Sequence, residues 1–378
     1  MNKKIVFLTG TRADFGKLKS LIEIIDKEQI YDVHIFVTGM HMQVKYGYTV
    51  DEIEKYGFKN IYKYINHTTE KSMDQTLAKT IEGLSNYVRE FQPDLIVIHG
   101  DRVEALAGAI VGALNNILVA HVEGGEVSGT IDELIRHAVS KMSHIHFVSN
   151  DTAKGRLIQM GEKENNIYII GSPDIDVMYS NSLPSLEEVK KHYDIQFSNY
   201  AILLFHSVTT EIEHIEYYSQ ELVDAVIESN FPFVVIYPNN DMGSNAIMKE
   251  YKKLETGKNF RVFPSIRFES FLVLLKNAKF ILGNSSAGIR EAPYYGLPAI
   301  NIGTRQQNRS LQEDIINCGH KKEEILNAIH IAQNIKIPKT DSFGTGNSNV
   351  LFLEALINER FWKTSKQKQF NDLITTYA

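Results

Sequence analysis

Cysteine is almost absent from this sequence, since Cys318 is the only one among 378 residues. A lone cysteine cannot form a disulfide within the chain, which excludes a disulfide-rich scaffold and fits a reducing compartment. Long apolar runs are also missing, and no segment approaches the roughly 20 residues that a membrane helix needs. The apolar run at residues 5–8 is too short for a signal peptide core. We therefore expect a cytoplasmic protein with no membrane partner.

The sequence has no excess of positive charge. Lys and Arg total 40 against 46 Asp and Glu, so the formal net charge is −6. This balance does not provide the basic surface that binds a phosphate backbone, and we expect no nucleic-acid partner. Small anionic ligands stay possible, because helix N-termini and a few arginines bind them whatever the net charge.

Several signatures of cofactor and metal chemistry are missing as well. The chain has neither a Walker motif nor a Gly-x-Gly-x-x-Gly fingerprint, which disfavours P-loop hydrolysis and dinucleotide redox chemistry. No spacing of His and Cys suggests zinc, and the acidic segments do not follow a calcium-loop pattern. We therefore expect no cofactor and no metal.

Apolar runs that are typical of buried strands alternate with amphipathic segments along the chain. A first series lies at residues 5–8, 33–37, 95–98, 117–120, 144–149 and 167–170. After a polar stretch at 178–198, a second series lies at residues 200–205, 233–237, 261–263, 280–282 and 299–302. This βαβ rhythm predicts parallel sheets.

The length of the chain is sufficient for two domains with separate cores. We predict an α/β protein with two Rossmann-like domains that face each other across a cleft. The expected ranges are 1–175 for the N-terminal domain, 176–355 for the C-terminal domain, and 356–378 for a C-terminal helix that can cross back to the N-terminal domain.

Polar clusters follow four of the predicted strands, and they read GTRAD at 10–14, HGDR at 99–102, HVE at 121–123 and HSVTT at 206–210. Ligands of open α/β sheets bind at the carboxyl ends of the strands, so these clusters are candidate site residues. Asp101 and Glu123 end successive strands, and a third acid lies on the following loop. Such carboxylates suit removal and return of a proton at one carbon. Asp101 alone could instead cap the next helix, and a histidine at a strand end is more often structural.

Residues 283–291, GNSSAGIRE, are typical of a strand end, a turn and a helix start. Free backbone N–H groups with the hydroxyls of Ser285 and Ser286 can bind phosphate there, and Glu291 can accept hydrogen bonds from ribose. The alternative is an ordinary serine N-cap that Glu291 completes as a capping box. Three arginines could add positive charge to the same site: Arg12, Arg305 and Arg309.

Together these motifs resemble the UDP-N-acetylglucosamine 2-epimerase family, and within it the hydrolysing enzymes of sialic acid pathways. The likeness spans nearly the whole chain and rests on GTRAD at 10–14, TGMH at 38–41, HGDR at 99–102, HVEGGEVSGTID at 121–132, GNSS at 283–286 and GTRQ at 303–306. The long acidic motif distinguishes the hydrolysing members from the non-hydrolysing branch. The resemblance implies a GT-B fold and a homodimer or homotetramer that needs no cofactor.

The resemblance also implies a reaction, in which UDP-N-acetylglucosamine (UDP-GlcNAc) and water give N-acetylmannosamine and UDP through a 2-acetamidoglucal, for surface polysaccharide synthesis. The implied acid/base residues are Asp101, Glu123 and Asp132, while His206 contacts the leaving diphosphate and His41 lies near the sugar. The implied UDP-binding residues are Arg12, Arg102, Asn239, Ser285, Ser286, Glu291 and Arg305, with Arg267 and Phe268 at the uracil.

Several alternatives remain open from the sequence. One is a hydrolysing epimerase for UDP-2,4-diacetamido-2,4,6-trideoxyglucose in legionaminic acid synthesis, and another is a non-hydrolysing UDP-GlcNAc 2-epimerase. A GT-B glycosyltransferase would share only the fold, and a nucleotide-sugar sensor would bind without turnover. The segment after GTRQ departs from the family pattern at residues 307–309, which affects the orientation of Arg309.

Overall fold

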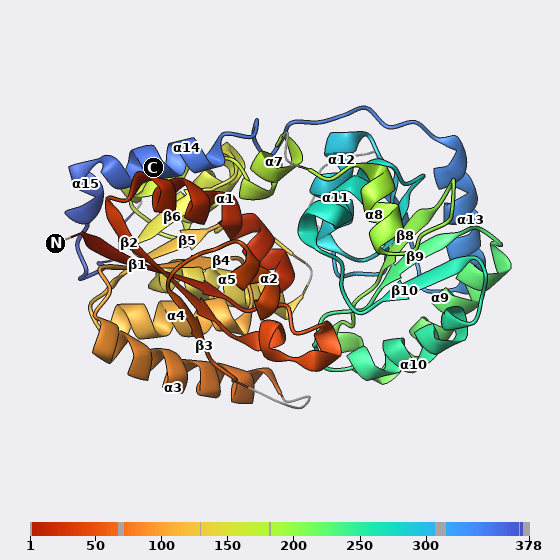
Figure 1. Cartoon of the computed structure of the whole chain (residues 1–378), viewed down its shortest axis with the longest axis horizontal. Coiled ribbons are helices and arrows are strands. Elements are labelled where there is room, and N and C mark those ends of the chain that lie inside the picture. The colour runs from red at the N-terminus through yellow and green to blue at the C-terminus, as the bar shows by residue number, and fades with distance from the viewer. Residues whose placement is uncertain are drawn as a thin grey trace, which may run out of the picture. The chain divides into compact units, whose positions relative to one another are not determined.

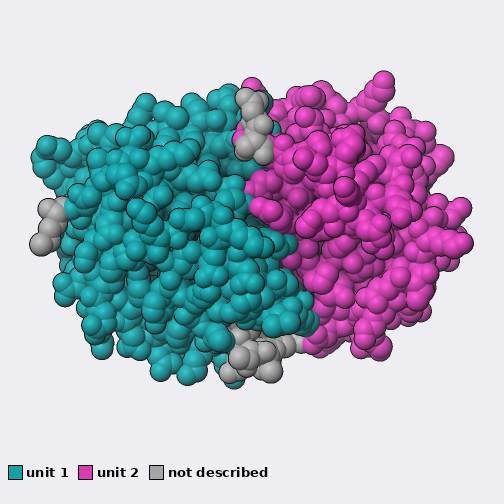
Figure 2. Space-filling model, viewed as in Figure 1, with its two compact units in different colours: residues 1–126, 132–179, 342–378 teal, residues 127–131, 180–341 magenta. Residues whose placement is uncertain are grey.

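The computed structural model describes residues 2–66, 72–128, 130–180, 183–306, 315–369 and 371–372. The chain forms two compact units, which Figure 2 shows in different colours. Unit 1 consists of residues 1–126, 132–179 and 342–378, and unit 2 consists of residues 127–131 and 180–341. Each unit is built on its own parallel sheet, which confirms the predicted α/β class with two domains.

The sheet of unit 1 has the strand order β3-β2-β1-β4-β5-β6-β7, and all its neighbours pair in parallel. The strands are β1 (Lys3–Thr9), β2 (Tyr31–Val37), β3 (Ile61–Lys63), β4 (Leu95–His99), β5 (Leu118–Val122), β6 (Ile145–Val148) and β7 (Ile167–Ile169). The central strands are apolar on both faces because helices cover both sides. The order changes direction between β1 and β4, where open α/β sheets bind ligands.

Helices lie on both faces of this sheet. They are α1 (Arg12–Glu28), α2 (Val50–Lys55), α3 (Met73–Phe91), α4 (Val103–Leu114), α5 (Ile131–Met142), α6 (Asp151–Gln159), α7 (Pro173–Met178), α14 (Ser348–Ile357) and α15 (Glu359–Trp362). Figure 1 shows α14 beside α1 on one face and α3 beside α4 on the other. Short 3₁₀ turns are η1 (Gly39–Met42), η2 (Val44–Tyr46) and η3 (Glu164–Asn166).

The sheet of unit 2 is also parallel, in the order β10-β9-β8-β11-β12-β13. Its strands are β8 (Ala201–Leu204), β9 (Phe233–Ile236), β10 (Phe260–Phe263), β11 (Ile281–Gly283), β12 (Ala299–Ile302) and β13 (Ile315–Cys318). Its helices are α8 (Leu186–His192), α9 (Ile215–Glu228), α10 (Ser244–Glu255), α11 (Phe268–Lys276), α12 (Glu291–Tyr295) and α13 (Lys322–Asn334), with 3₁₀ turns η4 (Thr209–His214) and η5 (Ser286–Gly288).

The unit boundaries differ from the expected domain ranges at three places. Residues 127–131 group with unit 2, whereas the sequence placed them in the N-terminal domain. Residues 176–179 and 342–355 group with unit 1, whereas the sequence placed them in the C-terminal domain. The reason is packing, because α14 contacts α1 and α7 and buries Phe352 in the core of unit 1. No helix in the described part of the chain is both long enough and apolar enough to cross a bilayer.

Candidate active site

Asp101 and Glu123 lie at the same edge of the unit 1 sheet, as their places after β4 and β5 predict. The parallel register pairs His99 at the end of β4 with Val122 at the end of β5. Glu123 follows Val122 directly, and Asp101 follows His99 after one glycine. The two acids thus come from the loops that leave neighbouring strands.

Arg136 of α5 joins these two loops. One guanidinium nitrogen donates to the main-chain carbonyl of Glu123 at 2.6 Å, and the other donates to the carboxylate of Asp101. The Arg136 side chain is only 2% exposed, so its planar guanidinium fixes the spacing of the loops. Asp132 precedes Arg136 by four residues and is half-buried. The two side chains therefore share one face of α5, and α5 adds Asp132 to this edge of the sheet.

The Glu123 carboxylate is bound by side chains from three other elements. His99 Nε2 donates to one carboxylate oxygen at 2.9 Å, and the Ser172 hydroxyl donates to the other. The Lys17 ammonium lies 3.6 Å from the oxygen that His99 binds. These contacts hold the side chain at 4% exposure, so Glu123 has a fixed position at the sheet edge.

The backbone of Glu123 is left-handed, with φ 63°. This region costs a residue with a side chain about 1 to 3 kcal/mol. Its N–H donates to the Phe147 carbonyl at 2.8 Å, while its own carbonyl accepts from Arg136. Hydrogen bonds on both sides thus hold a strained backbone that aims the carboxylate at His99 and Ser172.

Exposure distinguishes the two acids. The Asp101 side chain is 22% exposed, against 4% for Glu123. A group that exchanges a proton with carbon must reach that carbon. Asp101 therefore has the geometry for direct contact with a substrate, and Glu123 has the geometry of a buried charge next to it.

Four further side chains complete this cluster, and the sequence assigned a role to none of them: Lys17, His99, Ser172 and Asp174. Asp174 is fully buried and lies 3.1 Å from the Lys17 ammonium. His99 had a signal in the sequence, because it belongs to the HGDR cluster. Ser172 and Asp174 lie where the first α/β series ends, which marks them only weakly. Lys17 had no signal, since its position one turn into α1 becomes significant only through tertiary packing.

His41 is buried beneath the β1 and β2 ends, at 1% exposure. Its Nδ1 lies 2.6 Å from the Thr49 hydroxyl, and its Nε2 lies 3.0 Å from the Thr9 hydroxyl, which donates to Asp14. Because Thr9 donates to the carboxylate, Nε2–H donates to Thr9 and Nδ1 accepts from Thr49. Burial, with a smaller effect of the Arg12 charge, lowers the pKa of His41 to about 3. This geometry favours a neutral positioning group over one that touches the sugar.

We expect the stability of the protein to fall in acid partly because of His41. Its pKa rises from about 3 in the folded state to the ordinary 6.5 on unfolding, so the unfolded chain binds the proton more tightly. The resulting stabilisation is complete above pH 6.5 and is lost as the pH falls towards 3. Between pH 7 and pH 5 the loss is about 2 kcal/mol from this residue. Urea titrations at pH 7 and pH 5 measure the free energy of unfolding. Between these two pH values, His41→Gln should lose about 2 kcal/mol less of it than the wild type.

The exposed His214 provides a matched control, because His214→Gln should leave the difference between pH 7 and pH 5 unchanged. Equal losses for the wild type and His41→Gln would contradict the assignment of a buried neutral imidazole.

Arg12 and Arg102, two predicted UDP ligands, are both paired with acids within unit 1. Arg12 begins α1 and donates to Glu52, while Arg102 Nε donates to the buried Glu104 at 3.3 Å. The β1 and β2 ends pack closely here, since a Cβ at Gly39 would lie 2.6 Å from the Gly10 carbonyl oxygen. Both guanidiniums keep partial exposure, so each can bind an anion on its outer side.

His206 lies at the corresponding edge of the unit 2 sheet, just after β8. The Asn239 backbone N–H donates to His206 Nδ1 at 3.0 Å. An accepting Nδ1 places the proton of the neutral ring on Nε2. His206 therefore presents a donor, which suits the oxygen of a departing phosphate. Asn239 contributes to the site through its main chain.

Asn284 holds three strand-end loops of unit 2 together. Its side chain accepts from the His206 N–H at 2.7 Å and donates to the His206 carbonyl at 2.8 Å. Its own carbonyl accepts from Arg305 at 3.1 Å and from Gln306 at 2.8 Å. A Cβ at Gly283 would lie 2.0 Å from the Leu204 carbonyl oxygen, so only glycine allows this approach.

Replacing Asn284 by Leu should weaken UDP binding at least tenfold. Leucine keeps the volume but leaves the buried N–H and carbonyl of His206 without partners, which costs about 1 to 3 kcal/mol for each. Isothermal titration calorimetry with UDP measures the change. Asn277→Leu is the control, because Asn277 also bonds a main-chain carbonyl but lies at the end of α11. Unchanged affinity in Asn284→Leu would contradict this role.

The end of β11 is the region of four predicted UDP-binding residues: Ser285, Ser286, Glu291 and Arg305. The Ser285 hydroxyl accepts from the Ala287 N–H at 3.3 Å and so caps η5; this is the N-cap that the sequence left as an alternative. Both serines are half-exposed, whereas Glu291 is buried at the start of α12. The loop that contains Ser285 thus presents two hydroxyls and, through Asn284, the Arg305 guanidinium.

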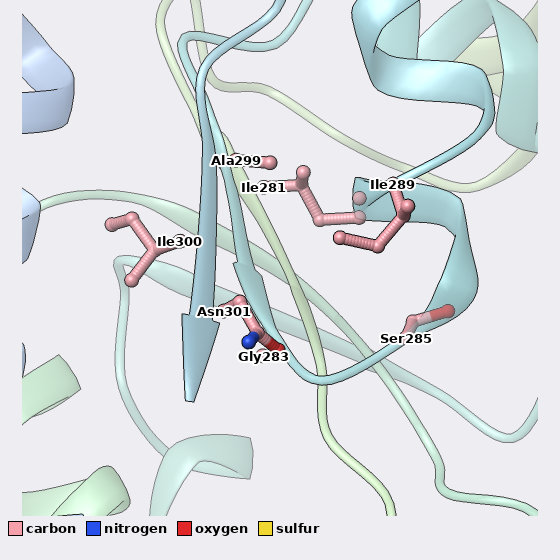
Figure 3. A pocket seen from close by; sticks show the side chains of 8 residues that line it. Ile281, Gly283, Ser285, Ile289, Ala299, Ile300 and Asn301 are labelled. Atoms are coloured by element: carbon pink, nitrogen blue, oxygen red, sulfur yellow. The ribbon is translucent and has the colours of Figure 1, made fainter. Parts of the chain in front are cut away.

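A small cavity lies behind this loop (Figure 3). It is lined by Gly283, Ser285 and Asn301 together with apolar residues of β11 and β12 and with Gly288 and Ile289 at the end of η5. Its volume is about 10 Å³, which accommodates about one water molecule. A nucleotide is therefore too large to enter this cavity.

The two residues predicted at the uracil, Arg267 and Phe268, differ in their surroundings. Arg267 occupies the N-cap position of α11, and its backbone N–H donates to the Tyr193 hydroxyl at 3.0 Å. Phe268 begins α11 and is buried, so its ring is part of the packing of unit 2. Arg309 lies outside the described residues. In the described ranges, no group of three His, Cys, Asp or Glu side chains is arranged to bind a metal ion.

Comparisons with known proteins show which family this chain is similar to. A family model described as UDP-N-acetylglucosamine 2-epimerase matches residues 23–357. A UDP-N-acetylglucosamine 2-epimerase of Neisseria meningitidis serogroup B is 49% identical over 375 residues, which are 98% of this chain and 99% of that protein. A UDP-N,N'-diacetylbacillosamine 2-epimerase (hydrolyzing) of Legionella pneumophila is 33% identical over 355 residues, or 92% and 94% of the two chains.

The fold has a counterpart among solved structures. The crystal structure of Methanocaldococcus jannaschii UDP-GlcNAc 2-epimerase in complex with UDP-GlcNAc and UDP superimposes with a TM-score of 0.81. The match covers 94% of this chain and 99% of that one, at 24% sequence identity. At this identity the likeness shows the fold, which is of the GT-B type.

Proposed function

The chain belongs to the UDP-N-acetylglucosamine 2-epimerase family, and we propose that it is a hydrolysing member that converts UDP-GlcNAc and water into N-acetylmannosamine and UDP. The observation that carries this proposal is the acid cluster of unit 1. There a single buried guanidinium ties the Asp101 carboxylate to the Glu123 main chain. That guanidinium belongs to Arg136 of α5, and Asp132 lies on the same face of this helix.

The reaction needs two proton transfers at sugar carbon 2. A base removes the carbon-2 proton, the bond between carbon 1 and the diphosphate oxygen breaks, and a double bond forms between carbons 1 and 2. Water then adds to carbon 1, and a proton returns to carbon 2 from the opposite face. Two acid/base groups are therefore required. We assign them to Asp101 and Asp132, with Glu123 as the charged group that fixes their surroundings.

The departing diphosphate needs hydrogen-bond donors and positive charge. In unit 2 the tautomer of His206 provides an Nε2–H donor, and the loop after β11 provides the hydroxyls of Ser285 and Ser286. Arg305 adds a guanidinium that the Asn284 carbonyl orients. We propose that Glu291 binds the ribose hydroxyls and that Arg267 lies beside the uracil. The product N-acetylmannosamine would serve sialic acid and surface polysaccharide synthesis. We propose that the enzyme acts as a homodimer or homotetramer.

The second candidate is the same hydrolysis of UDP-2,4-diacetamido-2,4,6-trideoxyglucose. It is favoured by the 33% identity to a relative named for a diacetamido sugar. The two sugars differ at carbons 4 and 6, and the residues assigned above act at carbon 2 and on UDP. The lower identity places this candidate second, after the relative that is 49% identical.

Product analysis distinguishes these functions. Purified protein is incubated with UDP-GlcNAc or with the diacetamido nucleotide sugar, and the products are separated by anion exchange and identified by proton NMR, which distinguishes the epimers at carbon 2. We expect UDP and free N-acetylmannosamine in equal amounts from UDP-GlcNAc. UDP-N-acetylmannosamine as the final product would establish the non-hydrolysing reaction. Turnover of the diacetamido substrate alone would establish the second candidate.

A further inference from the structure

We propose that Lys368, in the segment after α15, is a positioning residue for the acid/base site, because it fixes the C-terminal end of α5. The N-terminal half of α5 carries Asp132 and Arg136. The activity part of this inference rests on the proposed function, whereas its structural part does not.

The Lys368 ammonium binds the last turn of α5 and the residue that follows it. It lies 3.1 Å from the Ser140 carbonyl oxygen, 2.8 Å from that of Lys141 and 2.6 Å from that of Ser143. The last carbonyls of a helix have no partners within the helix. A cation at this end also interacts favourably with the helix dipole. The Lys368 side chain thus caps the C-terminus of α5.

A buried acid holds the ammonium in place. Glu162 lies 2.6 Å from Lys368 and also binds Lys141 at 3.0 Å and His146 at 2.9 Å. Burial works to raise the pKa of Glu162, but the His146 hydrogen bond and the Lys368 charge outweigh it and lower that pKa to about 2. The carboxylate is therefore ionised at neutral pH and attracts the ammonium.

A second contact fixes the backbone of the same segment. His144 Nδ1 accepts from the Val119 N–H of β5 at 3.1 Å, so its Nε2 carries the proton and donates to the Lys366 carbonyl at 3.1 Å. The C-terminal segment is thus attached both to α5 and, through His144, to β5, the strand that precedes Glu123.

The distance from this attachment to the acid cluster is short. Ser140, whose carbonyl Lys368 binds, lies one helical turn after Arg136. A turn of α-helix rises about 5.4 Å. A shift at the end of α5 therefore moves the guanidinium that binds Asp101 and the Glu123 carbonyl. Such a shift would change the proton-transfer groups while leaving the UDP-binding loops of unit 2 unchanged.

The test compares Lys368→Met with Lys363→Met, which removes an exposed lysine paired with Glu359 on α15. We expect Lys368→Met to lower kcat at least tenfold, to change KM for UDP-GlcNAc less than threefold, and to speed amide hydrogen exchange in residues 131–142. The control should match the wild type in all three measurements. A chain that ends at residue 365 provides a second variant, which lacks no described helix or strand and should behave like Lys368→Met.

Unchanged kcat and unchanged exchange in α5 would overturn the inference. Faster exchange spread equally over α5 and over α10 of unit 2 would also overturn it, because that pattern indicates general destabilisation. If the wild type did not turn over UDP-GlcNAc, the proposed function would fail, and the exchange measurement would still decide whether Lys368 holds α5.

Discussion

Asp101→Asn is expected to lower the turnover of UDP-GlcNAc by about 10³-fold, within the range that a general acid or base contributes. Asp101 is the more exposed acid of the cluster, and its carboxylate is oriented by Arg136. Asparagine keeps an oxygen that accepts from Arg136, so the local geometry should persist while the capacity to exchange protons is lost. Initial rates of UDP release measure the effect.

The control for this variant is Asp94→Asn. Asp94 precedes β4, at the opposite edge of the same sheet, and pairs with Lys3 at 2.7 Å. Its replacement should leave the rate of UDP release within about twofold of the wild-type rate, because surface ion pairs contribute little to stability. If Asp101→Asn kept more than a tenth of the wild-type rate, Asp101 would not be a proton-transfer residue.

Glu123→Gln is expected to lower turnover by about 10² to 10³-fold while UDP affinity changes only a few-fold. Both oxygens of Glu123 accept hydrogen bonds, from His99 and from Ser172. A glutamine presents an NH₂ group to one of these donors, so one contact is lost. It also removes the negative charge 3.6 Å from the Lys17 ammonium. Rates and UDP titrations on the same sample separate the two effects.

Glu126→Gln provides the matched comparison from the same loop. Glu126 is buried and accepts from the Ser149 hydroxyl at 2.8 Å, and glutamine can still accept that hydrogen bond. We expect its turnover to stay within about threefold of the wild type. Near-normal turnover in Glu123→Gln would show that the charge at position 123 is not required.

Local pattern was sufficient to predict the two parallel sheets, because each long central strand is an apolar run bounded by turn residues. The short edge strands β3 and β13 were missed, since three or four partly exposed residues give no clear periodicity. The return of the chain into unit 1 was expected only from residue 356. Its earlier start depends on the burial of Phe352, which is a property of tertiary packing.

The candidate site shows the same division. Asp101 and Glu123 could be placed at one edge because parallel strands align their carboxyl ends. The role of Arg136 required the structure, because two donors of one guanidinium reach two loops only after α5 has packed. Lys368 lies 228 residues from Ser140 in the sequence, and no local pattern connects them. Contacts between residues so far apart in the sequence depend on the tertiary fold, and they produce no periodic pattern in the sequence.

In the proposed reaction the carbon-2 proton is removed and replaced while UDP leaves. The most direct test is to incubate the protein with UDP-GlcNAc in D₂O and to follow the products by proton NMR. We predict free N-acetylmannosamine with one deuterium at carbon 2, formed together with UDP. A free sugar that keeps protium at carbon 2, or a UDP-GlcNAc signal unchanged after long incubation, would contradict the proposed reaction.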